Sequence, residues 1–324
     1  MRIMRGTVVG VLRGGPSREH EVSLSSGAAV LAALAPERFT VRDIYIDKQG
    51  TWHERGRAMD PADILRTLDA VVIALHGEYG EDGEVQKVLE RAGVPYTGSD
   101  SFSSFIAMHK VMAKECAKEA GVRTAEYRYI DSIEKMEPIL HDVVRSFMQP
   151  VVVKPVRWGS SVGVSLVTGY EPLYKAVSKL LDEGAGGVLI EEYIRGTEAT
   201  SGVVENLRGE ALYALPSVEI LPPDSAEFFT YDAKYSGASR ELTPGRFPKA
   251  VQKELADSAR TMHQALGLRH YSRSDFIVSP RGVYYLETNT LPALGQGRSF
   301  TSAADAIGVP LPAFLEHLIR AVLG

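Results

Sequence analysis

A segment near the C-terminal end, SRSDFIVSPRGVYYLETNT, places acidic and amide side chains on two strand-like runs joined by a tight turn. Proline and arginine suit the centre of a type I turn, and glycine can take the left-handed conformation that follows it. Residues 280–282 are therefore expected to form a three-residue hairpin loop. In that register Ser279 pairs with Val283, while Phe276 and Leu286 share one face of the hairpin.

The same count brings Asp275 opposite Glu287 and returns Asn289 to their face. Like charges that lie directly opposite repel each other, so a cation is expected between them. Two carboxylates and an amide are hard oxygen ligands that suit Mg²⁺ held jointly with phosphates. Arg273 shares this face and could neutralise the two carboxylates instead, so a metal site and an arginine-bridged pair both stand as interpretations.

A lysine and a Gly/Ser-rich turn stand together in VVVKPVRWGSSVGVSLV, residues 151–167. Lys154 ends one strand-like run, and the small residues that follow would let backbone N–H groups approach a phosphate closely. A Walker A loop is disfavoured, because there the lysine follows the loop and a helix begins. The stretch by itself is equally compatible with a phosphate cradle and with a polar hairpin turn.

Two other glycine-rich loops follow predicted strands of a parallel sheet, where ligands often gather. His76 in ALHGEYGEDGEVQ would, as a lone histidine, more often be structural, and Glu19 in GGPSREHEVSLSSG could complement a helix dipole or receive a substrate ammonium. Residues 222–246 show no period, as in many lids and binding loops, although a solvent-exposed excursion looks the same; Lys234 and Tyr235 are the candidates there.

These side chains need elements that position them. The first hundred residues alternate strand-like and helical patterns in a βαβαβ order, which predicts a Rossmann-like parallel sheet covered by helices. A second region opens with one long predicted helix, residues 103–121, and continues as α+β, with the turn at Gly159 joining strand to strand. We expect an α/β and α+β protein with domains at residues 1–104, 105–196 and 197–324.

Composition narrows the classes of partner. The 324 residues are 44% hydrophobic and 24% charged with a net charge of -5, which is ordinary for an enzyme and disfavours nucleic acid or an anionic membrane as partner. The single cysteine, Cys116, is expected to be a spare thiol rather than a nucleophile. No apolar run approaches a membrane span and no signal peptide is recognisable, so a cytoplasmic location is expected.

The chain resembles the D-alanine:D-alanine ligase family of the ATP-grasp superfamily nearly end to end. The segments that carry the resemblance occur in family order: GGPSREHEVSLSSG, LHGEYGEDGEVQ, PYTGSD, KPVRWGSSVGVS, VLIEEYIRGTE, YDAKY, RSDF and YLETNTLP. The resemblance implies a three-domain ATP-grasp fold with a preATP-grasp N-terminal domain, ATP between the central and C-terminal domains, two Mg²⁺ ions that Mn²⁺ could replace, and a homodimer.

Carried over residue by residue, Lys110 and Lys154 would hold the ATP phosphates. Glu191 and the backbone near Ile194 would read adenine, and Glu198 would hold the ribose. The full sets are Lys110, Lys154, Ser161, Glu191, Glu192, Ile194 and Glu198 for ATP, and Asp275, Glu287 and Asn289 for the metals.

The family reaction has two steps, in which a D-alanine carboxylate takes the γ-phosphoryl group of ATP and the amine of a second D-alanine attacks the acyl phosphate. Glu19 would bind the first ammonium, supported by Ser160 and Tyr235. Arg273 would stabilise the acyl phosphate and the tetrahedral centre, and Lys234 would approach the transferred phosphate.

One segment departs from the family. Where relatives continue much like NTSPGMTxxS, this chain reads NTLPALGQGRS, so Arg298 takes the place of the serine that holds the acceptor carboxylate, and Ser299 follows it. Ala293 can still supply a backbone N–H. Arg298, Ser299 and His76 are the expected substrate-binding residues, and Tyr235 favours an amine acceptor.

The function expected first is synthesis of D-alanyl-D-alanine for peptidoglycan precursors. A ligase of the same superfamily with another amino-acid or hydroxy-acid acceptor comes second, and a nucleotide-binding protein without ligase activity comes third. A dehydrogenase is weaker still, because the GxGxxG fingerprint is missing.

Overall fold

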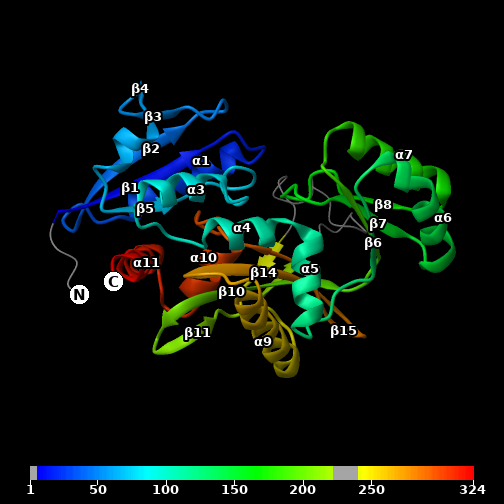
Figure 1. Ribbon diagram of the computed structural model, residues 1–324. Coiled ribbons are helices and arrows are strands. Elements are labelled where there is room, and N and C mark those ends of the chain that lie inside the picture. Colours follow the sequence, from blue (N-terminus) through cyan, green and yellow to red (C-terminus); the bar gives the residue numbers. More distant parts are fainter. Residues whose placement is uncertain (1–5, 222–239) are drawn as a thin grey trace.

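The computed structural model describes residues 6–221 and 240–324, and these residues form three sheets with helices packed on them (Figure 1). Lys234, Tyr235 and most of the 222–246 segment lie outside the described residues. The sheets draw on residues 7–73, 127–192 and 197–289. The predicted domain limits at 104 and 196 both fall between sheets, and as domain limits they stay predictions.

The first sheet has the order β4-β3-β2-β1-β5, and β1 pairs in parallel with both β2 and β5, as the βαβαβ pattern predicted. Strands β3 and β4 extend it with an antiparallel edge that was not predicted. Its strands are β1 (Thr7–Gly14), β2 (Phe39–Ile46), β3 (Trp52–Glu54), β4 (Arg57–Ala58) and β5 (Ala70–Ile73); its helices are α1 (His20–Ala33), α2 (Pro61–Leu65) and α3 (Glu84–Ala92).

The second sheet, β6-β9-β7-β8, is antiparallel and has its own apolar core against α6 and α7. Strands β7 and β8 pair with each other, so the Gly/Ser-rich stretch is a hairpin turn. Its elements are β6 (Tyr127–Ile130), the short 3-10 helix η1 (Ile133–Lys135), α6 (Met136–Ser146), β7 (Val151–Pro155), β8 (Ser165–Val167), α7 (Tyr170–Asp182) and β9 (Val188–Glu192).

The third sheet, β13-β12-β10-β14-β15 with β11 beside β10, packs against α9 and α5. Its elements are α4 (Ser101–Met108), α5 (Lys110–Glu119), β10 (Thr197–Leu207), β11 (Glu210–Ala214), β12 (Val218–Leu221), β13 (Arg240–Leu242), α9 (Lys249–Ala265), β14 (Tyr271–Ser279) and β15 (Gly282–Asn289).

The single helix predicted over residues 103–121 is wrong, because the chain turns at His109 between α4 and α5. His109 is extended, with φ -85° and ψ 96°, and its ring accepts a hydrogen bond from the Met112 N–H. The Lys110 N–H leaves the helical pattern and donates to the carbonyl of Val156 on the neighbouring sheet. The break is therefore made by a tertiary contact, which the helical periodicity could not reveal.

The predicted hairpin register is wrong at the turn and right at the carboxylates. The loop has two residues rather than three, since Ser279 pairs with Gly282. Phe276 pairs with Tyr285, and a bulge after it restores the predicted pairing of Asp275 with Glu287. Leu286 is the extra residue of the bulge and faces the candidate site instead of sharing the core with Phe276.

The C-terminal helices return to the first sheet. Helices α10 (Ser299–Ala306) and α11 (Leu311–Leu323) share one apolar core with β1, β2 and β5, and α11 lies beside that sheet in Figure 1. Among the described residues no single helix is long and apolar enough to cross a membrane; α10 and α11 reach that size only together, bent by 97°. This packing joins the start of the chain to its end and fixes the loops between them.

Candidate active site

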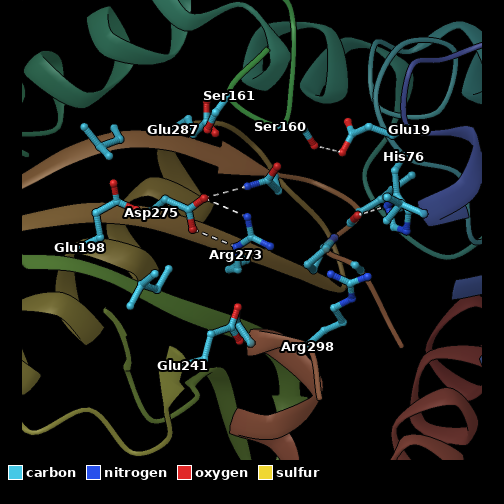
Figure 2. A pocket seen from close by; sticks show the side chains of 18 of the residues that line it. Glu19, His76, Ser160, Ser161, Glu198, Glu241, Arg273, Asp275, Glu287 and Arg298 are labelled. Carbon is cyan, nitrogen blue, oxygen red and sulfur yellow. Dashed lines mark hydrogen bonds and ion pairs between the residues drawn. The ribbon is translucent and has the colours of Figure 1, made fainter. Parts of the chain in front are cut away.

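Two adjoining pockets bring together every described residue that the sequence nominated. The first lies where loops of the first sheet meet the third sheet, and Figure 2 shows Glu19 and His76 at one end of it, Arg273 and Asp275 in the middle and Glu198 at the other end. The second lies between the second and third sheets. Nominated residues in the first are Glu19, His76, Ser160, Ser161, Glu198, Arg273, Asp275, Glu287, Asn289, Arg298 and Ser299; those in the second are Lys110, Lys154, Ser161, Glu191, Glu192, Ile194, Glu198 and Glu287.

The β7–β8 turn reaches across to the first sheet at Glu19. The Ser160 hydroxyl donates a hydrogen bond to the Glu19 carboxylate. A Cβ added to Gly159 would lie 2.7 Å from that carboxylate, so any larger residue there would make the Glu19 side chain shift. Ser160 and Ser161 both have positive φ, 52° and 58°, a conformation that costs side-chain-bearing residues of the order of 1 kcal/mol each. The strained turn is held against Glu19, and Ser161 lines both pockets.

Buried charges in the middle of the first pocket compensate one another. One edge of the Arg273 guanidinium binds Asp275 in a bidentate manner: Nε donates to Oδ1 and Nη2 to Oδ2, each at 2.8 Å. Asn289 donates to the same carboxylate at 3.2 Å, and Lys110 lies 3.1 Å from Glu287. The pKa of Arg273 is raised, because the attraction of Asp275, Glu287 and Glu81 exceeds the effect of burial. Arg273 thus pairs with Asp275, and Glu287 pairs with Lys110, so the two carboxylates have separate cationic partners rather than the shared arginine that the sequence allowed.

The same cluster has the donor chemistry of a magnesium site. Asp275, Glu287 and Asn289 offer two carboxylates and an amide oxygen from neighbouring strands, facing the pocket, and hard oxygen donors suit Mg²⁺. Across residues 6–221 and 240–324, no group of three or more His, Cys, Asp or Glu side chains is arranged to hold a metal. Since the third member here is an amide, this cluster fits a cation shared with phosphate oxygens better than a cage made by protein alone.

His76 links two distant segments of the chain through hydrogen bonds of its ring. Its Nδ1–H donates to the Leu291 carbonyl at 2.9 Å, and its Nε2 accepts from the Ser26 hydroxyl at 2.7 Å. The Leu294 N–H also donates to the Ser26 oxygen, at 3.3 Å. Burial, with the charges of Arg273 and Arg298, lowers the pKa of His76 to about 4, so the ring is neutral. Both ring nitrogens therefore have protein partners, and the histidine joins α1 to the segment after β15.

Glu81 is a site residue that the sequence reasoning did not nominate. One carboxylate oxygen accepts from the Gly77 N–H at 3.0 Å and the other from the Leu291 N–H at 3.1 Å, so it links the loop after β5 to the exit of β15. Burial and the charge of Glu19 raise its pKa to about 8. Its position in the same glycine-rich loop as His76 was the feature of the sequence from which a site role for Glu81 could have been predicted.

The second pocket combines apolar walls with lysines. Ala125, Val152, Pro155, Ile194 and Ile277 line it beside Lys110 and Lys154. Glu191, only 3% exposed, lies 2.7 Å from Lys154 and 2.7 Å from Lys114. A role for Lys114 was not predicted from the sequence. The residue lies four positions after Lys110 on α5 and therefore on the same face of the helix. An apolar slot with cationic ends suits a flat ring system carrying phosphates.

Comparison with known proteins identifies the family. The family described as "D-ala D-ala ligase N-terminus" matches residues 8–64 and 53–99, and "D-ala D-ala ligase C-terminus" matches residues 116–320. The chain belongs to the D-alanine–D-alanine ligase family. The D-alanine–D-alanine ligase of Syntrophobacter fumaroxidans is 39% identical over 97% of this chain and 97% of its own length, and that of Desulforudis audaxviator is 37% identical over 96% and 97%.

Solved structures of this ligase family have the same fold. The VanG D-Ala:D-Ser ligase from Enterococcus faecalis superposes with a TM-score of 0.87 and 27% identity, covering 99% of this chain and 100% of that one. The Bacillus anthracis D-alanine–D-alanine ligase complexed with ATP gives 0.81 and 28%, covering 98% and 97%. The predicted α/β and α+β ATP-grasp architecture is therefore confirmed, and the chain is a member of a family of ATP-dependent ligases.

Arg298 lies at the wall of the first pocket, where the sequence predicted an acceptor site. It caps α10, is partly buried, and lines the first pocket with Ser299 and Ala293. Figure 2 shows its side chain projecting into the pocket near His76. Within residues 6–221 and 240–324 its guanidinium has no hydrogen bond or ion pair. A partly buried guanidinium at the wall of a pocket is suited to bind an anion such as a carboxylate.

The raised pKa of Glu81 gives the stability of this family member a pH dependence. The ordinary pKa is 4.5 and the folded-state pKa about 8, so between them the folded protein keeps a proton that the unfolded chain has released. Stability should then fall as pH rises, by up to about 1.4 kcal/mol per pH unit. Glu81→Gln should flatten this fall, measured by urea unfolding.

Comparing the parent with Glu81→Gln from pH 6.5 to 8 isolates this effect, because the other shifted groups, Lys114 among them, are present in both proteins. His76 gives the opposite slope, but only below its ordinary pKa of 6.5, where the unfolded chain takes up a proton that the buried ring refuses. Parallel curves for the parent and Glu81→Gln proteins above pH 6.5 would contradict the assignment.

Proposed function

We propose that this protein joins two D-alanines to D-alanyl-D-alanine with ATP, through an acyl phosphate, for the synthesis of peptidoglycan precursors. One observation carries the proposal: the lysine-lined apolar pocket and the polar pocket that holds Glu19 and Arg273 meet at Glu287 and Ser161. A phosphoryl donor bound in one would reach an acceptor bound in the other. Family membership and the ATP complex of a relative support the same reading.

The nucleotide would occupy the second pocket. Its adenine would lie between the apolar walls near Ile194, with Glu191 at the amino edge, and Glu198 at the boundary of the two pockets would hold the ribose. Lys110, Lys154 and the amides near Ser161 would bind phosphate oxygens as point charges and donors. Glu192 also lines this pocket.

Asp275, Glu287 and Asn289 would hold two Mg²⁺ ions, or Mn²⁺ in their place. When bound, such ions neutralise charge on the transferred phosphoryl group and align it. The protein's part is geometric, because the cross-strand pair and the Asn289 amide are set by one hairpin whose bulge fixes their register.

The first D-alanine would place its ammonium on Glu19 and its carboxylate toward Arg273. Ser160, already hydrogen-bonded to Glu19, would keep that carboxylate facing the substrate. The substrate carboxylate attacks the γ-phosphorus and the bond to the β-phosphate oxygen breaks, leaving ADP and an acyl phosphate. Arg273 would stabilise the negative charge on this intermediate and on the tetrahedral centre that follows.

The second D-alanine would bind at the acceptor end. Its amine attacks the acyl carbon, a tetrahedral centre forms, and phosphate leaves as the amide is made. Arg298 and the amides that begin α10 at Ser299 would bind the acceptor carboxylate, and the Ala293 N–H would face the oxyanion. Lys234 and Tyr235, outside the described residues, keep their sequence-based roles near the transferred phosphate and beside Ser160. We also propose a cytoplasmic homodimer.

Magnesium-dependent ADP release on adding D-alanine, with D-alanyl-D-alanine identified by mass spectrometry, tests the proposal. Product of that mass together with ADP supports it. ADP that appears only with another amino acid or a hydroxy acid would assign a different acceptor, and ATP binding without turnover by any of these would leave a nucleotide-binding protein.

Glu287→Gln should abolish turnover without unfolding the protein, because an amide keeps the shape of the side chain but removes a metal-binding charge at the junction of the pockets. ADP release and the circular dichroism spectrum are measured together. Glu210→Gln on β11, outside both pockets, is the matched control and should stay near parent activity. Activity of Glu287→Gln close to that of the control would remove the metal assignment.

Arg298→Gln should raise the KM for the second D-alanine by about tenfold to a hundredfold, as expected for loss of a charged hydrogen bond worth ~1.5–3 kcal/mol. The KM for ATP should stay within about twofold. Arg298→Lys should recover part of the loss, because it keeps the charge but not the two-pronged geometry. Arg91→Gln on α3, exposed and away from both pockets, is the control; an unchanged second KM in Arg298→Gln would exclude the role.

A further inference from the structure

Three buried side chains at the wall of the nucleotide pocket form a charged trio. Glu191 on β9 has one carboxylate oxygen 2.7 Å from Lys114 and the other 2.7 Å from Lys154. The side-chain exposures are 4% for Glu191, 0% for Lys114 and 9% for Lys154. Two positive charges meet one negative charge, so the trio carries a net charge of +1 in a site largely removed from solvent.

The two lysines are held differently. Lys154 stands at the end of β7 and lines the nucleotide pocket together with Glu191. Lys114 lies behind Glu191 on α5 and does not line that pocket. Its ammonium also donates to the Thr124 hydroxyl at 2.5 Å, and Thr124 in turn donates to the Tyr285 carbonyl at 3.1 Å. Of these two lysines, Lys154 is therefore the one placed to contact a ligand in the pocket.

Phosphate binding in this pocket requires a change of partner for Lys154. If Lys154 were the sole counter-ion of Glu191, its departure would leave a carboxylate buried and uncompensated, which is strongly destabilising. With Lys114 in place, one ion pair is exchanged for another and Glu191 stays neutralised. The surplus positive charge is then the charge that the phosphate meets.

We propose that Lys114 is a positioning residue: it remains on Glu191 as a permanent counter-ion, so that Lys154 can leave Glu191 for a phosphate of ATP. This rests on the nucleotide site of the proposed function. Burial lowers the pKa of Lys114 to about 8 while the Glu191 charge opposes the shift, and the ammonium form prevails at neutral pH.

The test is the dissociation constant of ATP, measured by calorimetry with Mg²⁺ and without D-alanine. Lys114→Met keeps the length and apolar stem of the side chain and should weaken ATP binding at least about tenfold, with both D-alanine KM values nearly unchanged. Lys118→Met is the control, one turn further along α5 with a side chain 41% exposed, and should bind ATP like the parent.

A second substitution separates this role from general damage. In a Glu191→Gln background the neutral amide needs no counter-ion, so adding Lys114→Met should cost little ATP affinity. The Glu191→Gln single variant measures the loss of the adenine contact separately. A merely structural lysine would give further loss. Parent-like ATP affinity in Lys114→Met, or an equal loss on adding Lys114→Met to the parent and to Glu191→Gln, would overturn the proposal.

The parent protein supplies a measurement that needs no variant. In a crystal structure with a non-hydrolysable ATP analogue, Lys154 should contact a phosphate while Lys114 keeps its ion pair with Glu191. Lys154 still on Glu191, or Lys114 displaced, would overturn the proposal. If ATP binds in this way but no D-alanyl-D-alanine forms, the proposed ligase activity is wrong and the role of Lys114 stands. If the parent protein does not bind ATP, both the ligase activity and the role of Lys114 are overturned.

Discussion

Charge compensation inside a buried junction is the constraint on which the rest of this structure depends. Asp275 and Glu287 face each other across two antiparallel strands, an arrangement that is unfavourable unless cations lie beside them. Arg273, on the same strand, forms an ion pair with Asp275. Lys110, on a helix that begins beside the second sheet, forms an ion pair with Glu287. The three sheets meet where these charges meet.

The same principle repeats at each end of the site. Glu191 is held between Lys114 and Lys154, and Glu19 receives the Ser160 hydroxyl from the β7–β8 turn. Each of these contacts joins residues far apart in the chain, so the site exists only in the folded protein. Each of these buried carboxylates already has a counter-charge or a hydrogen-bond donor. A ligand that brings phosphates and cations would therefore replace existing ion pairs by new ones.

Patterns in the chain were enough to predict the parallel order of the first sheet, the β7–β8 hairpin and the facing of Asp275 and Glu287. Strand alternation and turn chemistry act over a few residues, so counting works. The count erred at the hairpin loop and was corrected by a bulge at Leu286, because the short turn and the bulge offset each other by one residue. Neither defect is visible from residue types alone.

The break at His109, the Glu81 link and the place of Lys114 depend on segments that come together only in the folded chain. His109 is extended because the next N–H bonds to Val156, and Glu81 is buried because it bridges Gly77 and Leu291. Lys114 matters because its ammonium reaches Glu191, which lies on β9. Local sequence therefore determined the residue types, the strand and turn patterns and the family. Tertiary packing decided which charges share a buried space, since burial and ion pairing depend on neighbours brought from other parts of the chain.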